Sequence, residues 1–235
     1  MIGQLASFWG GGELNNAQVF DGVFNYDQIA DNLGIVPGQS LTFYLRYRID
    51  FLQSQQRLFL IGQDAGTRIA ITYIGSNIRF IVTAGSNTVW TMPNPFVIGE
   101  LIDQIITYDT SGGFPGVVTF YNNGVKTVRD NGSGGSAPSG TFPDFTTIAT
   151  TETGTLNFNG LIQKVQVLDF VATDAQAAEV LESKTFRGVT GVNNSDFLLD
   201  FNANKKLPNT PTDDSDNAYS ITVNGGLSYS PFEDS

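Results

Sequence analysis

LIDQIITYDTSGGFPGVVTFYNNGVKTV, residues 101–128, contains the most informative pattern of strands and turns in this chain. Residues 101–108 are apolar and β-branched and predict a strand, whereas the glycines and proline of 110–116 predict a loop. Two more strands are expected at 117–121 and 125–128, with Asn-Asn-Gly between them. Asn-Gly between strand-forming residues indicates a hairpin, because a type I′ turn needs positive φ at both central residues. The stretch predicts antiparallel strands and shows no residues arranged for catalysis.

Short strand-forming segments precede this unit. Residues 41–50 alternate between apolar and polar side chains, which predicts a strand with one buried face and one face in water. Arg46 and Arg48 fall on the wet face, where we expect them to pair with nearby carboxylates. Four short strands separated by turns are expected within residues 57–92, and such spacing indicates a sandwich or a barrel. The side chains expected on the inner sheet faces are Phe43, Leu45, Ile71, Phe80, Ile105, Phe120, Ile162 and Val167.

A single helix is expected, over residues 173–183. Thr173 and Gln176 have the spacing of a capping box, and Asp174 lies in the first turn, where the helix dipole favours a negative charge. One apolar stripe runs along the helix, made of Ala177, Val180 and Leu181. We expect this helix to pack over one open end of the sandwich.

Composition and charge exclude several classes of function. A length of 235 residues with 40% hydrophobic residues suits one all-β domain over residues 1–235. The chain carries 12 Lys and Arg against 23 Asp and Glu, and this net charge of −11 repels nucleic acid and anionic membranes. It contains no Cys and no His, which excludes disulfides, thiolate metal sites, histidine bases and the usual zinc sites. No apolar run reaches the roughly 20 residues that membrane insertion requires.

Several motifs together resemble those of a known superfamily. They are Phe20-Asp21-Gly22, the ITYD and VTFYNNGV segments within 101–128, FNGLI at 158–162 before a Val-rich strand, the helix, and the acidic tail at 196–226. This set resembles the concanavalin A-like lectin/glucanase jelly rolls, in particular the laminin-G-like domains, over roughly residues 17–229. The resemblance implies an antiparallel two-sheet β-sandwich, with the tail motif in a permuted position at the C-terminus.

The tail contains the best candidate for a metal site, at Asp213, Asp214 and Asp216. Carboxylates crowded onto one turn suit calcium, which takes about 6–8 oxygen ligands and tolerates irregular geometry. Calcium is also common in the jelly rolls that this chain resembles, so calcium is the expected cofactor. The alternative is a solvated acidic turn that binds no metal.

Candidate ligand-binding residues are aromatic side chains that the sequence does not assign firmly to the core: Phe114, Trp90 and Tyr121. A flat ring stacks on the apolar face of a sugar, while neighbouring amide and carboxylate groups bind its hydroxyls. Phe114 lies on the Gly-rich loop 110–116, where little local core is available to it. Trp90 lies beside polar turn residues. For each of these rings the alternative is packing in the core or on a sheet face.

Some members of the superfamily are glycoside hydrolases, and the retaining ones use two carboxylates about 5–5.5 Å apart. Within one strand such a pair needs even spacing, because alternate residues share a face. Glu100 and Asp103 are an odd number of residues apart, and Glu152 is a single carboxylate among threonines. The sequence therefore predicts no enzymatic activity.

The expected function is that of a non-catalytic, adhesive module that binds a carbohydrate or a host surface receptor. Residues 1–16 lack the basic and apolar regions of a secretory signal, and the chain is rich in Gly, Asn and Thr. This combination favours a phage or virus protein, located on the virion or outside the cell without a signal peptide, with other virion proteins as partners. A purely structural virion role, as a spike, fibre or decoration subunit, is the alternative, and a glycoside hydrolase is the third.

Overall fold

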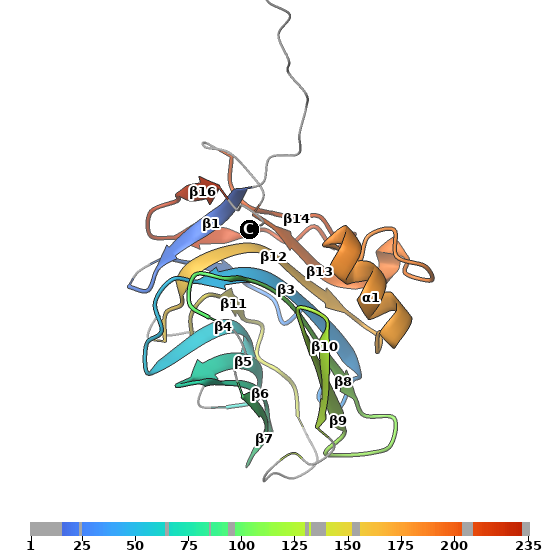
Figure 1. Ribbon diagram of the computed structural model, residues 1–235. Coiled ribbons are helices and arrows are strands. Elements are labelled where there is room, and N and C mark those ends of the chain that lie inside the picture. The colour runs from blue at the N-terminus through green and yellow to red at the C-terminus, as the bar shows by residue number, and fades with distance from the viewer. Residues whose placement is uncertain are drawn as a thin grey trace, which may run out of the picture.

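The computed structural model describes residues 16–23, 25–63, 66–84, 86–93, 97–129, 132, 140–151, 156–203 and 209–231. Two antiparallel sheets face each other across a shared core and form a sandwich, with one α-helix within the described residues (Figure 1). The antiparallel β-sandwich with a single helix that the sequence predicts is therefore confirmed.

The larger sheet has nine strands in the order β10-β9-β8-β3-β12-β1-β16, and β13 and β14 extend it beside β12. In that order they are β10 (Val125–Arg129), β9 (Val117–Asn122), β8 (Leu101–Asp109), β3 (Leu41–Ile49), β12 (Asn159–Leu168), β1 (Asn16–Asp21), β16 (Tyr229–Pro231), β13 (Phe197–Asn202) and β14 (Thr212–Asp213). The predicted strand 41–50 lies near the middle of this sheet, between β8 and β12.

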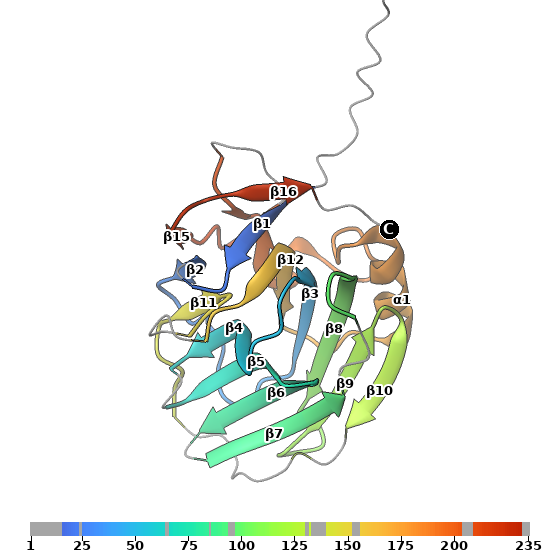
Figure 2. The ribbon, with the colours of Figure 1, turned by 60° about the vertical axis from the view of Figure 1, so that its left-hand side comes forward.

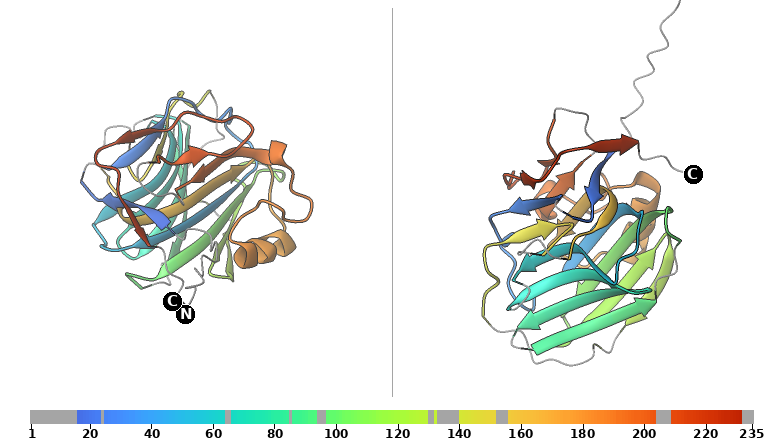
Figure 3. Two further views of the ribbon diagram at one scale, coloured as in Figure 1. Left: turned by 90° about the horizontal axis from the view of Figure 1, so that it is seen from above. Right: turned by 90° about the vertical axis from the view of Figure 1, so that its left-hand side faces the viewer.

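The smaller sheet has seven strands in the order β15-β2-β11-β4-β5-β6-β7. They are β15 (Thr222–Asn224), β2 (Tyr26–Ile29), β11 (Thr146–Ile148), β4 (Gln55–Gly62), β5 (Arg68–Ile74), β6 (Asn77–Ala84) and β7 (Ser86–Pro93). β4 to β7 are consecutive antiparallel neighbours, as the right-hand view of Figure 3 shows. These are the four short strands predicted within residues 57–92.

The predicted hairpin forms, and it lies at one edge of the larger sheet. β9 and β10 pair with Asn122 opposite Val125, and the two residues between them, Asn123 and Gly124, have φ values of 44° and 88°. Positive φ at both positions is the condition for a type I′ turn, and glycine meets it without steric cost. β8 pairs with the other edge of β9, so the three strands predicted from 101–128 are adjacent.

The core between the sheets is built around aromatic rings. Phe80 on β6 contacts Phe43, Trp90 and Tyr108, with ring centroids 5.6, 5.8 and 5.4 Å away. All eight side chains predicted to lie in the core are buried. Seven lie between the sheets, but Ile105 lies on the outer face of the larger sheet. Both faces of β8 are apolar and buried, so its composition does not reveal which face points inward.

α1 (Asp174–Ser183) lies on the outer face of the larger sheet, not over an open end of the sandwich as predicted (Figure 1). Its predicted capping box is present, because the Thr173 hydroxyl accepts from Gln176 N at 3.2 Å and Thr173 N donates to Gln176 Oε1 at 2.9 Å. Ala177 and Val180 are the buried helix side chains. A short 3₁₀-helix, η1 (Asn194–Asp196), precedes β13. No helix in the described part of the chain is long and apolar enough to cross a membrane.

The outer face of β3 is buried along with its inner face, although the sequence predicts one face in water. Tyr44 on this face packs with side chains of α1 and of the segment that follows it. Further along the strand, Arg46 is 3% exposed, and its Nη1 lies 3.7 Å from Asp103 Oδ1. At the strand end, Arg48 Nε lies 2.6 Å from Asp50 Oδ1. Both arginines therefore pair with carboxylates, as predicted.

The last strands of the chain return to the first ones. β16 pairs with β1 in the larger sheet, and β15 pairs with β2 in the smaller sheet. The two pairs lie together at one edge of the sandwich, in the upper part of Figure 3 (right). The C-terminal tail thus completes both sheets beside the N-terminal strands.

Candidate functional site

A polar cleft lies beside the larger sheet, where β8 begins, β9 turns into β10 and α1 ends. Figure 2 shows these elements side by side. The cleft has a volume of about 700 Å³, within the roughly 300–1,000 Å³ typical of small-molecule sites. The residues that line it are Glu100, Leu101, Asp103, Asn123, Gly124, Leu181 and Lys184. It therefore combines carboxylate, amide and ammonium groups with leucine side chains.

The hairpin turn forms one wall of the cleft and is fixed to β8 by Asn123. The Asn123 side chain accepts from Asp103 N at 2.8 Å and donates to Leu101 O at 3.2 Å. Its backbone N–H donates to Asp103 O at 2.9 Å. Three bonds from one residue hold the turn against the start of β8, so this wall is preorganised.

Asp103 forms the floor of the cleft and connects the sheet to the helix. It is 8% exposed, and its Oδ1 accepts from the Tyr44 hydroxyl at 2.6 Å. Its Oδ2 accepts from Lys184 Nζ at 2.7 Å. Lys184 ends α1 in the left-handed conformation, with φ of 59°. Burial, together with the neighbouring Asp103 carboxylate, raises the pKa of Tyr44 well above its ordinary value.

Glu100 and Asp103 line the same cleft, although the sequence places them on opposite faces of a strand. The reason is that β8 begins at Leu101, so Glu100 lies before the strand and does not follow its alternation. The Glu100 side chain is exposed, whereas both oxygens of Asp103 already accept hydrogen bonds within the protein.

An exposed apolar tip lies at the same end of the sandwich. Gly99 N donates to Ile49 O at 2.8 Å, so the loop before β8 is joined to the end of β3. On these two segments Phe51, Val97 and Ile98 are 61%, 62% and 53% exposed. Phe51 was not among the candidate aromatics. The one sequence feature that could have identified it as exposed is its position just after the alternating strand 41–50. It is an exposed flat ring at the end of the sandwich where the cleft lies.

The structure places the predicted ligand-binding aromatics elsewhere and corrects two of them. Trp90 is 1% exposed and packs against Phe80 and Tyr108 in the core, because its side chain points to the inner face of β7. Tyr121 is 6% exposed and donates to Asp174 Oδ1 at 2.6 Å, so it holds the start of α1 against the sheet. Phe114 is half-buried in the loop between β8 and β9, at the opposite end of these strands from the Asn123 turn. A ligand contact by Phe114 stays a prediction of the sequence, as the alternative to a ligand in the cleft.

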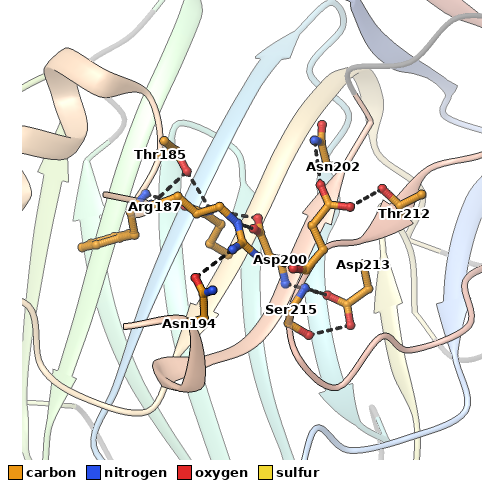
Figure 4. A network of polar contacts seen from close by, with 11 residues as sticks. Thr185, Arg187, Asn194, Asp200, Asn202, Thr212, Asp213 and Ser215 are labelled. Atoms are coloured by element: carbon orange, nitrogen blue, oxygen red, sulfur yellow. Dashed lines mark hydrogen bonds and ion pairs between the residues drawn. The ribbon is translucent and has the colours of Figure 1, made fainter. Parts of the chain in front are cut away.

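Two of the three predicted metal residues, Asp213 and Asp214, take part in a network of polar contacts at β13 and β14, and Figure 4 labels Asp213 within it. Asp213 accepts from Asp200 N, Ser215 N and Ser215 Oγ at 2.9, 3.0 and 2.7 Å, and from Tyr219 N at 2.8 Å. Asp214 accepts from side chains of neighbouring residues, and Asp216 is exposed. Within the described residues, no group of three or more His, Cys, Asp or Glu side chains is arranged to hold a metal ion.

An ion pair between the buried Asp200 carboxylate and the partly exposed Arg187 guanidinium forms the centre of this network. Arg187 Nε donates to Asp200 Oδ2, and the Asp200 side chain is 1% exposed. Asp200 Oδ1 also accepts from Gln166 Nε2 at 2.8 Å, and Arg187 Nη1 donates to Asn194 Oδ1 at 3.0 Å (Figure 4). Burial lowers the pKa of nearby Lys164, although the charge of Asp200 opposes this shift. The groups bind one another, so the network joins β12, β13 and the segment after α1.

Calcium binding at Asp213, Asp214 and Asp216 stays a prediction of the sequence, and thermal unfolding tests it. Calcium that binds only the folded protein raises the melting temperature as its concentration rises. The prediction is that EDTA reverses this rise and that Asp214→Asn abolishes it. Identical melting curves in EDTA and in millimolar calcium would contradict a site at this turn.

Comparison with protein families matches residues 9–178 to the family described as the concanavalin A-like lectin/glucanases superfamily. Comparison with curated proteins finds no significant match. Among solved structures, a candidate carbohydrate binding protein from Bacteroides ovatus ATCC 8483 aligns with a TM-score of 0.62 and 15% identity. The alignment covers 95% of this chain and 61% of the Bacteroides protein, so this chain spans less than two thirds of that relative.

Two smaller proteins share the fold over nearly their whole length. The SAP-like pentraxin from Limulus polyphemus aligns with a TM-score of 0.56 and 15% identity, over 90% of this chain and 95% of the pentraxin. The CBM40 module of the Ruminococcus gnavus IT-sialidase, bound to α2,3 sialyllactose, aligns with a TM-score of 0.54 and 12% identity. That alignment covers 74% of this chain and 100% of the module. At these identities the likeness concerns the fold.

Proposed function

Because the chain belongs to the concanavalin A-like lectin/glucanase superfamily, we propose that it is a carbohydrate-binding module whose ligand occupies the polar cleft at the start of β8. The observation that carries this proposal is the cleft itself. Its lining offers the exposed Glu100 carboxylate for hydroxyls, and Leu101 and Leu181 for the apolar face of a sugar. The solved structure of a related fold with bound sialyllactose supports a carbohydrate ligand.

The charge of the cleft favours a neutral sugar. Lys184 is the cation among the lining residues, and its Nζ is 2.7 Å from Asp103 Oδ2, so its charge is already compensated. Glu100 adds a second carboxylate, which gives the lining a net negative charge. An acidic sugar would meet this charge at short range, within a chain whose net charge is −11. We therefore expect neutral glycans to bind better than sialylated ones.

The two carboxylates of the cleft also favour a second candidate function, glycoside hydrolysis, which the sequence alone disfavours. A hydrolase needs one carboxyl group to act on the leaving group and another to act as nucleophile or base. Asp103 is 8% exposed and accepts from Tyr44 and Lys184, so its oxygens are engaged in holding the protein together. Binding without hydrolysis fits this arrangement better.

The site of action proposed for this module is the surface of a phage or virus particle, or another extracellular surface. Its support is compositional, since the chain is acidic, free of Cys and rich in Gly, Asn and Thr. Copurification with particles that also bind glycans would support this placement. Copurification without any glycan binding would instead support a purely structural virion subunit.

A glycan array incubated with the purified protein tests the proposed function. We expect saturable binding to neutral glycans, and weaker binding to the same glycans carrying sialic acid. Nitrophenyl glycosides assayed in parallel should show no release above the buffer rate. An array with no saturable signal would contradict carbohydrate binding, and turnover that Glu100→Gln abolishes would support the hydrolase.

A further inference from the structure

A buried polar pair connects the two sheets at the edge of the sandwich formed by β1, β2, β15 and β16. Gln18 on β1 and Asp27 on β2 both point into the sandwich, because they share strand faces with the core residues Phe20 and Ile29. Gln18 is 0% exposed and Asp27 is 1% exposed. Gln18 Nε2 donates to Asp27 Oδ1 at 3.1 Å, which makes a contact between the larger and the smaller sheet.

The pair contains two buried oxygens that lack a donor. Within the structure described, neither Gln18 Oε1 nor Asp27 Oδ2 has a hydrogen-bond partner. Both are acceptors when Asp27 is ionised, so neither can satisfy the other. Leaving a buried acceptor without a donor destabilises the folded state, and more so when the acceptor is charged. One proton on Asp27 Oδ2 removes both deficits, because the carboxyl group then donates to Gln18 Oε1.

We propose that Asp27 holds a proton in the folded protein and forms a reciprocal, two-bond pair with Gln18, which makes this edge of the sandwich pH-sensitive. Carboxylic acid and primary amide groups are both planar, with a donor and an acceptor side by side. One bond, from Gln18 Nε2 to Asp27 Oδ1, is already present. The proton that we propose on Asp27 Oδ2 supplies the second bond by donating to Gln18 Oε1, the other buried oxygen without a partner.

The surroundings of the pair favour the neutral acid. β2 itself and the strands packed around it, β1, β11, β15 and β16, carry no Lys or Arg. Their other titratable side chains are Asp21, Tyr26 and Tyr229. Burial and the charge of Asp27 raise the pKa of Tyr229 to about 12, so it stays neutral. Burial raises the pKa of Asp27 from 3.8 to about 7, and the Gln18 bond opposes that rise only in part.

The direction of the pH effect follows from the proton balance. Between pH 3.8 and about pH 7 the folded protein keeps the Asp27 proton that the unfolded chain releases. Unfolding therefore becomes easier as the pH rises through this window, by about tenfold in its equilibrium constant per pH unit. Above pH 7 both states are ionised and this contribution stays constant. The paired first and last strands are held most tightly in acid.

The test compares the pH dependence of urea unfolding in the wild-type protein and in Asp27→Asn. The asparagine amide reproduces both bonds of the protonated pair without a titrating group. We expect Asp27→Asn to gain stability over wild type as the pH rises from 4 to 7, reaching at least a hundredfold in the unfolding constant. The control Asp50→Asn changes an exposed carboxylate and should show no such gain.

A titration of the wild-type protein keeps the test independent of the variant. The ¹³C resonance of the Asp27 carboxyl group should titrate with a midpoint near pH 7 while the protein stays folded. A midpoint below pH 5 would overturn the proposal. So would a stability difference between Asp27→Asn and wild type that does not change with pH.

Discussion

Replacing Phe80 with alanine should lower the free energy of unfolding by about 3–5 kcal/mol, the range found when a packed aromatic side chain is removed from a core. Phe80 lies on β6 with its ring between those of Phe43, Trp90 and Tyr108, all within 5.8 Å between centroids. Its side chain is 0% exposed. The cavity would open between the two sheets, beside rings from β3, β7 and β8, whose strands hold these rings apart. Urea unfolding at constant pH measures the change.

The same substitution at an exposed phenylalanine is the matched control. Phe51 is 61% exposed, so Phe51→Ala should cost less than about 1 kcal/mol. Equal losses at the two positions would contradict the packing of Phe80 between the two sheets. A loss below about 1 kcal/mol for Phe80→Ala would have the same meaning.

Removing the Asp200 carboxylate should have the second large effect. Asp200→Ala leaves the Arg187 guanidinium and the Gln166 amide without their acceptor. The Asp200 side chain is 1% exposed, so water does not readily replace it. Breaking a buried ion pair typically costs about 3–5 kcal/mol. The Arg187 side chain is 33% exposed and can regain water, so we expect a smaller loss of about 2–4 kcal/mol.

An exposed ion pair provides the control for Asp200. Arg48 and Asp50 are 29% and 37% exposed, and Asp50→Ala should cost no more than about 1 kcal/mol. High salt should reduce the Asp50 effect and leave most of the Asp200 effect, because buried charges are screened less. If Asp200→Ala unfolds as easily as Asp50→Ala does, the Arg187 network contributes little to stability.

The local features of this fold could be predicted because single residues determine them. Asn123 and Gly124 specify a turn that needs positive φ, and Thr173 with Gln176 specifies the start of the helix. Alternation along the strands identifies buried side chains, since each element has a fixed period. Alternation does not show which face of a strand points into the sandwich when a helix buries the outer face as well. Ile105 is an example, because it is buried under α1 on the outer face of the larger sheet.

The cleft could not be predicted because distant segments assemble it. Its lining comes from residues 100–103, 123–124 and 181–184, and no local pattern links these segments. The position of the helix on the outer face of the larger sheet decides that Lys184 meets Asp103. Trp90 and Tyr121 were misplaced for a related reason, because the sequence shows their polar neighbours but not the elements that cover them. The Gln18–Asp27 pair likewise depends on how the two sheets face each other.

The most direct test of carbohydrate binding at the cleft is a calorimetric titration of the best neutral glycan from the array against three single variants. Glu100→Ala removes an exposed carboxylate from the cleft, Glu182→Ala removes one from the other side of the helix end, and Phe114→Ala changes the loop at the far end of β8. If the glycan binds in the cleft, Glu100→Ala weakens binding about tenfold or more. The other two variants then bind like wild type and keep the melting temperature of wild type. Binding that survives Glu100→Ala but is lost in Phe114→Ala would contradict the cleft and place the ligand at the 110–116 loop.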